Sequence, residues 1–246
     1  MIYFFSGTPG SGKSLHVAKM IDQWHRRGKN VIANFEINEH FWDKKHLSRQ
    51  ADILEVGNDG LTVDFLLDYA DKYHARNEKG QIKEKQTLLI IDECQTMFNS
   101  RSWNQRGRSQ WVVFFTQHRK FGYEVVLISQ HKDLVDKQIR NCFEYNYVHR
   151  NIKNFKFFGW LLSRFIPGKN FIVVSVTWMT TGKHDHANFL FGMKRYFSLY
   201  DSYKIFDTKN LRQLSPAAGP QDGVRGPDVG AGGGDADRRP EGCCST

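Results

Sequence analysis

The stretch Gly7-Thr8-Pro9-Gly10-Ser11-Gly12-Lys13-Ser14 decides the fold expected of this chain. It matches the pattern G-x-x-x-x-G-K-[ST] at all four fixed positions. The apolar run Ile2–Phe5 precedes it, and a segment with helical spacing of apolar residues follows it. A strand, this loop and a helix in succession form the phosphate-binding unit of many nucleotide-binding proteins. The sequence therefore predicts a site for a nucleoside triphosphate; an ordinary glycine-rich turn before a helix is the alternative interpretation.

The parts of this loop have separate tasks in the predicted site. Glycines let successive N–H groups point at one place, where the positive end of the helix dipole also favours phosphate. We expect Lys13 to reach the β- and γ-phosphates, and the Ser14 hydroxyl to bind Mg²⁺. The residues predicted to bind ATP are Gly7, Thr8, Pro9, Gly10, Ser11, Gly12, Lys13 and Ser14.

Length and composition indicate one α/β domain with appendages. A chain of 246 residues can bury one substantial core. Residues 1–141 hold the motifs of the predicted ATPase core, and residues 142–214 are predicted to form a β-rich extension of the same domain. Residues 215–246 contain four of the six prolines, eight of the 21 glycines and no aromatic residue. Because such a segment cannot bury enough apolar surface to offset the entropy of ordering, we expect a disordered tail.

Charge and cysteine content narrow the class of partner and the compartment. The formal net charge is +9, which suits nucleic acid, acidic lipid headgroups or acidic proteins without choosing among them. The four cysteines show no C-x-x-C spacing, and two of them lie in the predicted tail. Neither a disulfide framework nor a zinc site is indicated, which favours a reducing cytoplasm.

No signal peptide or membrane-spanning helix is expected. The loop begins at Gly7, which leaves no room before it for the charged start and apolar core of a signal peptide. The best candidate for a membrane span, residues 155–178, is interrupted by Ser163-Arg164 and by Pro167-Gly168-Lys169. It falls short of the roughly 20 consecutive apolar residues that a spanning helix needs.

Apolar spacing predicts alternating helices and strands along the ATPase core. The alternation is that of a parallel sheet covered on both sides, a three-layer α/β sandwich of the P-loop NTPase class with a mostly parallel sheet. Helices are predicted at Lys13–Arg27, Leu61–His74 and Trp111–Lys120, and strands at Val31–Ala33, Thr87–Ile91 and Glu124–Ser129.

Two acids follow the apolar run Thr87–Ile91 and have the appearance of a Walker B motif. In a buried parallel strand, the residues at the carboxyl end face the ligand crevice. Asp92 is predicted to hold Mg²⁺ through water, and Glu93 to polarise the attacking water as general base. A strand that simply enters a solvated turn is the alternative, and the phosphate loop favours the functional interpretation. Because Asp92-Glu93 supplies its own base, we expect an extra strand between the loop strand and this one.

Gln130 ends the next predicted strand, Glu124–Ser129. The same edge rule places it near the ligand, where it is a candidate to sense the γ-phosphate or orient the attacking water. A glutamine that only completes hydrogen bonds at the end of a strand is the alternative.

Three linked stretches and a weaker fourth stand out along the chain: Leu89–Asn104 around Asp92-Glu93, Phe115–Gln130, Val135–Arg140 and, more weakly, Leu199–Lys209. Together they resemble the filamentous-phage assembly ATPases, also called the zonula occludens toxin (Zot) N-terminal family. The similarity spans residues Met1 to about Leu211 and is fainter near its end.

The resemblance implies a motor that uses ATP to drive virion assembly and extrusion. Such a motor works from the host cytoplasm at the cytoplasmic face of the inner membrane, where it meets the single-stranded genome, the phage coat proteins and an exit complex. Typical members continue into a transmembrane helix and a periplasmic segment, whereas this sequence continues into a Pro/Gly-rich stretch. Two explanations stay open. Either the protein contacts the membrane through a partner or a surface patch, or the chain is a shortened relative of the family.

ATPases that assemble as rings or head to tail complete their site with an arginine from the neighbouring subunit. A homo-oligomer is therefore expected. Arg119 and Arg140 lie in the family-like stretches and are the first candidates for this arginine. A surface or interface salt bridge is the alternative for each of them.

Two further segments suggest partners. A cluster of basic and aromatic residues favours contact with single-stranded DNA, with a basic loop over the nucleotide or a subunit contact as alternatives. A second segment, Phe155–Ile166, mixes aromatic and basic residues as interfacial membrane segments do, with a buried strand pair or an oligomer contact as alternatives. The DNA-binding cluster would consist of Arg101, Trp103, Arg106, Arg108 and Trp111.

Other functions share the loop and stay open at this point. A DNA-translocating or packaging ATPase would require turnover that DNA stimulates. A nucleotide-gated scaffold would bind ATP and turn over little, and it would not need Glu93. A small-molecule kinase normally has an arginine-rich lid, and the Trp-rich segment after Glu93 argues against it.

Overall fold

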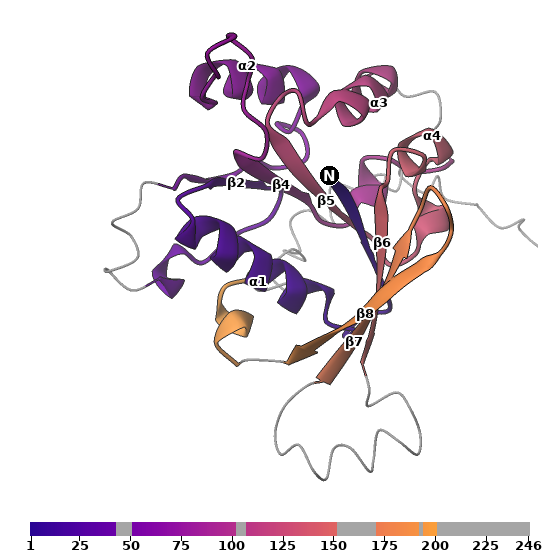
Figure 1. Ribbon diagram of the computed structural model, residues 1–246. Helices are drawn as coiled ribbons and strands as arrows, with labels where there is room; N and C mark the ends of the chain where they lie inside the picture. The colour runs from indigo at the N-terminus through magenta and orange to yellow at the C-terminus, as the bar shows by residue number, and fades with distance from the viewer. Residues whose placement is uncertain (43–50, 102–106, 152–170, 192–193, 201–246) are drawn as a thin grey trace, which may run out of the picture. The chain divides into compact units, whose positions relative to one another are not determined.

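The fold is built on a central sheet with helices on both sides (Figure 1). The computed structural model describes residues 1–42, 51–101, 107–151, 171–191 and 194–200. The predicted tail, residues 215–246, and the segment Phe155–Ile166 lie outside these residues.

The strands and helices follow the predicted alternation closely. The strands are β1 (Ile2–Ser6), β2 (Asn30–Ala33), β3 (Ile53–Glu55), β4 (Thr87–Ile91), β5 (Tyr123–Ile128), β6 (Tyr145–Asn151), β7 (Phe171–Trp178) and β8 (His184–Phe191). The helices are α1 (Lys13–Arg26), α2 (Val63–Tyr73), α3 (Arg108–Gln117) and α4 (Lys137–Arg140). Short 3-10 turns are η1 (Glu39–Phe41), η2 (Cys94–Thr96), η3 (Lys132–Leu134) and η5 (Lys194–Ser198).

The order of the strands decides where the two nucleotide motifs meet. The sheet runs β3-β2-β4-β5-β1-β6-β7-β8, and neighbouring strands from β3 to β6 are parallel. β5 therefore lies between β1, which leads into the phosphate loop, and β4, which leads into Asp92-Glu93. This confirms the predicted extra strand between the two motif strands.

Strand alternation divides the core into two layers, one on each face of the sheet. In β1, Ile2 and Phe4 belong to the core under α2 and α3, whereas Phe5 belongs to the core under α1. Figure 1 shows α1 on one side of the sheet and α2 and α3 on the other. Because successive side chains of a strand point to opposite faces, a strand buried on both faces is mostly apolar, as β4 is from Leu88 to Ile91. The predicted three-layer α/β sandwich is confirmed.

The β-rich segment after the ATPase core continues the same sheet. β6 pairs in parallel with β1, and β7 and β8 follow as antiparallel neighbours. Ile172, Val174 and Val176 on β7 are buried in the same core as α1. The extension therefore shares a core with α1, the helix that follows the phosphate loop.

One strand, β3, differs from the sequence-based expectation. It was not anticipated, because three residues of partly exposed chain carry too little alternation to be seen without the partner strand β2. Tyr73, the last residue of α2, is 52% exposed, and its ring contacts Tyr69. No helix within the described ranges is long and apolar enough to cross a membrane.

A buried ion pair ties α3 to α4. Arg108 Nη1 lies 2.8 Å from Asp136 Oδ2, and both side chains are almost fully shielded from solvent. The Asp136 carboxylate also accepts hydrogen bonds from the backbone N–H groups of Gln138 and Ile139, which makes it the N-cap of α4. Loss of Asp136 would leave a buried cation without its carboxylate.

Replacement of this carboxylate is expected to destabilise the domain strongly. Asp136→Ala should lower the free energy of unfolding by about 3 to 5 kcal/mol, because one partner of a buried pair stays behind. Asp71→Asn is the matched control: it breaks the exposed Asp71–Arg76 pair and should cost no more than about 1 kcal/mol. Urea denaturation of both variants measures the difference. Equal costs would contradict the role of the buried pair.

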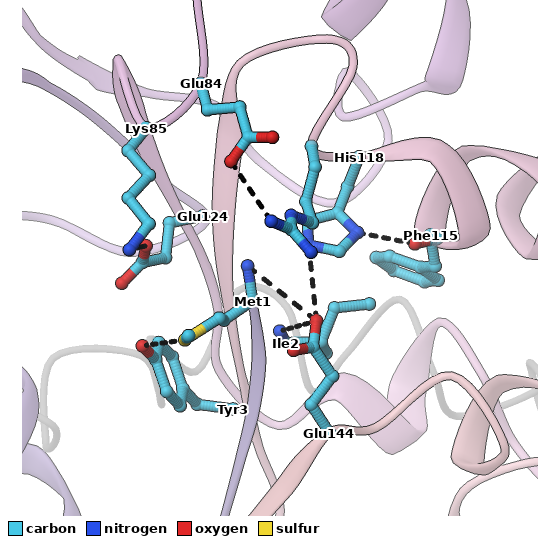
Figure 2. Close-up of polar contacts among 10 residues, drawn as sticks. Met1, Ile2, Tyr3, Glu84, Lys85, Phe115, His118, Glu124 and Glu144 are labelled. Carbon is cyan, nitrogen blue, oxygen red and sulfur yellow. Dashed lines mark hydrogen bonds and ion pairs between the residues drawn. The ribbon is translucent and has the colours of Figure 1, made fainter.

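The edge of the sheet opposite the phosphate loop carries a cluster of charged groups around Met1 (Figure 2). The Met1 amino group and the His118 ring Nε2 each lie 3.8 Å from the Glu144 carboxylate. His118 also contacts the Phe115 carbonyl oxygen through Nδ1 at 2.6 Å. Burial, and then the nearby amino terminus, lower the pKa of His118 to about 4. His118 is therefore neutral in the folded protein near neutral pH.

The low pKa of His118 predicts that acid destabilises the fold. In the unfolded chain this histidine gains a proton near pH 6.5, whereas in the folded state it does so only near pH 4. Stability is therefore complete above pH 6.5 and is lost as the pH falls toward 4, by up to about 3 kcal/mol from this one group. The measurement is the urea midpoint at several pH values for wild type and His118→Gln. The variant should show a flatter acid limb, whereas His186→Gln, an exposed control, should not. If the loss of stability at acid pH is the same in His118→Gln as in wild type, His118 is not the group that causes it.

Candidate nucleotide site

The phosphate loop connects β1 to α1 at the edge where the parallel strands end. Gly7, Gly10 and Gly12 have φ values of +143°, +74° and +101°, in the region that favours glycine. The loop is held by backbone hydrogen bonds from Gly7 N to the Gln130 carbonyl oxygen and from Ser11 N to the Thr8 carbonyl oxygen, at 3.2 and 3.1 Å. The loop conformation is thus tied to the end of β5.

Two of these glycines are also required by close contacts with the β-rich extension. A Cβ on Gly12 would lie 2.1 Å from Ile172 Cδ1 on β7, and a Cβ on Gly7 would lie 2.6 Å from the His149 carbonyl oxygen on β6. The glycines were evident in the sequence, but their close contacts with β6 and β7 were not. The loop is therefore shaped by the extension as well as by its own residues.

Lys13 is held inside the loop by its own backbone. Its Nζ donates hydrogen bonds to the carbonyl oxygens of Gly7 and Thr8, at 2.6 and 3.3 Å. Burial lowers the pKa of the Lys13 amine, and the carboxylates of Asp92 and Glu93 oppose that shift. The amine is therefore within electrostatic reach of both predicted acids and next to the place that the loop offers to phosphate.

Asp92 directly follows β4 and is half-buried among hydrogen-bonding partners. Its backbone N–H donates to Asn34 Oδ1 at 2.7 Å, and Asn34 Nδ2 donates back to the Asp92 carbonyl oxygen at 2.9 Å. The side chain accepts from the Glu93 N–H at 2.8 Å and from the Tyr200 hydroxyl. Burial raises the pKa of the Asp92 carboxyl, and the hydrogen bond from Tyr200 offsets part of that shift. Asn34 and Tyr200 were not recognised as site residues in the sequence. Asn34 lies in no motif, and Tyr200 lies in the weakly family-like stretch Leu199–Lys209, which assigned it no role.

Glu93 has a backbone conformation that is unusual for its residue type. Its φ and ψ are 45° and 44°, in the left-handed region, and it begins the turn η2. Its carboxylate accepts a hydrogen bond from the Gln95 side chain. Strained positions of this kind cluster at functional sites, where the fold compensates their cost of about 1 to 3 kcal/mol. Glu93 is a candidate general base for that reason as well as for its place after Asp92.

The oxygens of Ser14 and Asp92 suit Mg²⁺ bound together with a nucleotide. The Tyr200 hydroxyl donates a hydrogen bond to Asp92, and the Ser14 side chain is near enough to oppose the rise that burial causes in the Tyr200 pKa, so the two predicted ligands lie near one another. The residues that the structure describes contain no cluster of three or more metal-ligating side chains. Mg²⁺ commonly takes one or two carboxylates plus substrate phosphates rather than a full protein cage. The donor set therefore fits the predicted metal ligands.

Gln130 lies beside the loop at the end of β5. Its side chain is exposed, and it lines a cavity of about 560 Å³ together with Gly7 and Thr8. The other lining residues are Ser6, His131, Lys132, Asn146, Val148, His149, Arg150 and Asn151. The position suits a residue that contacts a nucleotide phosphate or a water molecule.

The two candidate arginines lie in different places. Arg119 forms an ion pair with Glu84 at 3.3 Å, both half exposed, near the edge of the sheet opposite the phosphate loop. Arg140, at the end of α4, pairs with Asp133 in η3, which follows Gln130. Arg119 is thus remote from the loop of its own chain, and any action at a nucleotide would have to be on a neighbouring subunit. A role in trans stays a prediction for both arginines.

The predicted basic and aromatic cluster is only partly described and is divided between core and surface. Trp103 and Arg106 lie outside the described residues. Arg108 is buried in its pair with Asp136, and Trp111 packs on Phe98 and Phe115. Arg108 is therefore occupied by a structural role and is not available to grip a phosphate backbone.

A family model described as zonular occludens toxin (Zot) matches residues 1–159 of this chain. The chain belongs to the Zot family. The gene 1 protein of Enterobacteria phage I2-2 is 26% identical over 223 residues, which cover 87% of this chain and 59% of the relative. The gene 1 protein of Enterobacteria phage f1 is 28% identical over 149 residues, 60% of this chain and 41% of the relative. This Zot-family chain thus spans less than two thirds of the length of these phage relatives.

Two solved structures are similar to this chain. The N-terminal domain of zonular occludens toxin from Neisseria meningitidis matches with a TM-score of 0.46 at 18% identity, over 81% of this chain and 98% of that domain. A second solved structure, that of an ATPase domain, matches with a TM-score of 0.51 at 11% identity, over 81% of this chain and 84% of that domain. The second likeness, at such low identity, supports the P-loop NTPase fold and nothing finer.

The contact between Gly12 and β7 predicts the effect of a single methyl group. Gly12→Ala should destabilise the protein far more than Gly28→Ala, which also has a positive φ but nothing within 4 Å of the added Cβ. The control should cost about 1 to 2 kcal/mol from backbone strain alone. Combining Gly12→Ala with Ile172→Ala should recover part of the loss, so that the two costs are less than additive. Urea denaturation of wild type, the three single variants and the double variant measures these costs; additive costs would show that the contact with Ile172 is unimportant.

Proposed function

We propose that this Zot-family chain is a Mg²⁺-dependent ATPase that drives assembly and extrusion of a filamentous phage at the host inner membrane. The observation that carries the proposal is the meeting of the two motifs. Lys13 and Ser14 after β1, and Asp92 and Glu93 after β4, lie at one edge of the parallel sheet, with electrostatic coupling between Lys13 and both acids. The similarity to gene 1 proteins of filamentous phages supports a role in phage assembly.

In this proposal ATP binds in the loop 7–14, whose N–H groups hold the phosphates. The Lys13 ammonium exchanges the carbonyl oxygens of Gly7 and Thr8 for phosphate oxygens. Ser14 and Asp92 hold Mg²⁺, which neutralises charge on the β- and γ-phosphates. Because both partners of the Lys13 amine are neutral carbonyls, binding anionic phosphate is the stronger interaction.

Hydrolysis requires a base on the side of the γ-phosphate that faces away from ADP. Glu93 accepts a proton from water as the water oxygen bonds to the γ-phosphorus and the bond to the β–γ bridging oxygen breaks, releasing ADP and phosphate. Gln130 is proposed to orient this water or to sense the γ-phosphate. Arg140 or Arg119 is proposed to stabilise the transferring phosphoryl group of a neighbouring subunit in a homo-oligomer.

The partners follow from the phage setting. We propose phage coat proteins and the exit complex as the machinery that the motor serves, at the cytoplasmic face of the host inner membrane. The net charge of +9 suits contact with the single-stranded genome or with anionic lipid. That charge also favours the second candidate function, a single-stranded-DNA-translocating or packaging ATPase with the same nucleotide site. A nucleotide-gated scaffold is the less favoured alternative, because it has no use for a strained Glu93.

Two substitutions separate binding from turnover. Lys13→Ala should abolish ATP binding and hydrolysis, because it removes the only loop cation. Glu93→Gln should retain ATP binding and lose roughly 10²- to 10⁴-fold in kcat, as expected for loss of a general base. Phosphate release and equilibrium binding of a fluorescent ATP analogue are the measurements. Glu78→Gln, an exposed acid on the α2–β4 connection, is the control and should match wild type.

The same assay distinguishes the candidate functions when single-stranded DNA or anionic lipid vesicles are added. Stimulation by DNA would favour the translocating ATPase, and stimulation by vesicles would favour the motor at the membrane. Binding without turnover under every condition would leave only the scaffold. Undiminished turnover in Glu93→Gln would rule out this residue as the base.

A further inference from the structure

The hydroxyl of Tyr200 lies beside the two predicted Mg²⁺ ligands. It donates a hydrogen bond to Asp92 Oδ2, and the Ser14 side chain is near enough to offset part of the rise that burial causes in the Tyr200 pKa. Tyr200 is 4% exposed, and in sequence it is 108 residues from Asp92. It therefore belongs to the nucleotide site, although it lies outside both sequence motifs.

The segment that carries Tyr200 is anchored to the elements around the phosphate loop. η5 lies beside α1 (Figure 1), and the Tyr196 hydroxyl donates to Asp22 Oδ2 of α1 at 3.1 Å. Asn38 donates from its backbone N–H to the Leu199 carbonyl oxygen and from Nδ2 to the Ser198 carbonyl oxygen, both at 3.0 Å. The backbone that leads to Tyr200 is thus held in place by several contacts.

Its ring is held as well. The Tyr200 ring packs against Phe35 with centroids 4.0 Å apart, and Leu199 beside it is fully buried. In this position the ring directs its hydroxyl at the Asp92 carboxylate. Packing of the ring therefore favours the side-chain conformation in which the hydroxyl contacts the site.

The Tyr200 hydroxyl occupies one acceptor position of the Asp92 carboxylate. Mg²⁺ takes oxygen ligands at about 2.0 to 2.1 Å in a near-octahedral arrangement. A metal ion at Asp92 Oδ2, or a water molecule bound to that ion, would compete with the phenol for this oxygen.

We propose that Tyr200 competes with Mg²⁺ for Ser14 and Asp92, and so sets the affinity of the site for metal-bound over metal-free nucleotide. Binding of the Mg²⁺ complex displaces the Tyr200 hydroxyl and loosens the contacts of residues 198–200 with Asn38. This inference rests on the proposed function, because it requires that the site bind Mg²⁺ with a nucleotide. It adds to that function a residue that couples the metal to the η5 segment.

The test is the binding of ATPγS to Tyr200→Phe, measured by calorimetry in MgCl₂ and in EDTA. Removal of the competing hydroxyl should tighten binding in MgCl₂ by roughly ten- to a hundredfold, the worth of a hydrogen bond to a charged group, and leave binding in EDTA unchanged. Tyr196→Phe is the matched control in the same segment: it loses the bond to Asp22 but not a contact with Asp92, and its ratio of the two affinities should equal that of wild type.

A second measurement does not depend on any substitution at the site. Hydrogen exchange of the peptide containing the Asn38 amide in wild type should be faster with ATPγS and Mg²⁺ than with ATPγS in EDTA, because its bond to Leu199 is lost. Equal or weaker binding of Tyr200→Phe in MgCl₂ would overturn the inference, since Tyr200 would then be neutral or supportive toward the metal. If wild type binds ATPγS in neither condition, the proposed function fails and this inference fails with it.

Discussion

Parallel pairing of β1 with β5 on one side and β6 on the other is the constraint on which the site depends. Parallel strands end at the same edge of a sheet, so the loop after β1, the acids after β4 and the glutamine after β5 are brought to one place. The hydrogen bond from Gly7 N to the Gln130 carbonyl oxygen joins two of these strand ends directly. A different strand order would leave every sequence motif intact but would place the phosphate loop, the two acids and Gln130 apart from one another.

Three key polar side chains of the candidate site, Lys13, Asp92 and Glu93, are paired with neighbouring groups of the protein. Lys13 bonds to loop carbonyls, Asp92 to Asn34 and Tyr200, and Glu93 to Gln95. Because a buried polar group without a partner is costly, these internal bonds keep the site stable without a ligand. Binding of a charged nucleotide then becomes an exchange of partners. The affinity depends on the difference between two sets of hydrogen bonds, which is why a single phenol at Asp92 can matter.

The β-rich extension is part of the nucleotide site rather than an appendage beside it. Ile172 on β7 and the His149 carbonyl on β6 lie against loop glycines, and η5 carries Tyr200 to Asp92. The Zot family model extends only to residue 159, whereas β7 and η5 come later in the chain. Contacts of this kind give the later segments a physical connection to the chemistry of the loop.

The sequence by itself determined the parts of the fold that depend on local patterns. Residues 7–14 specify a phosphate loop through their own backbone needs, and the apolar run before Asp92 specifies a strand buried on both faces. Helix limits were predicted within a few residues because apolar spacing and the glycine stop at Gly28 are local signals. Only the tertiary structure decided which distant residues meet these motifs. Asn34, Ile172 and Tyr200 reach the site through strand order and crossover connections, and no spacing rule relates residues 58 or 108 positions apart. Arg108 shows the same limit in reverse: its sequence neighbours suggested contact with DNA, and its burial beside Asp136 made it part of the core.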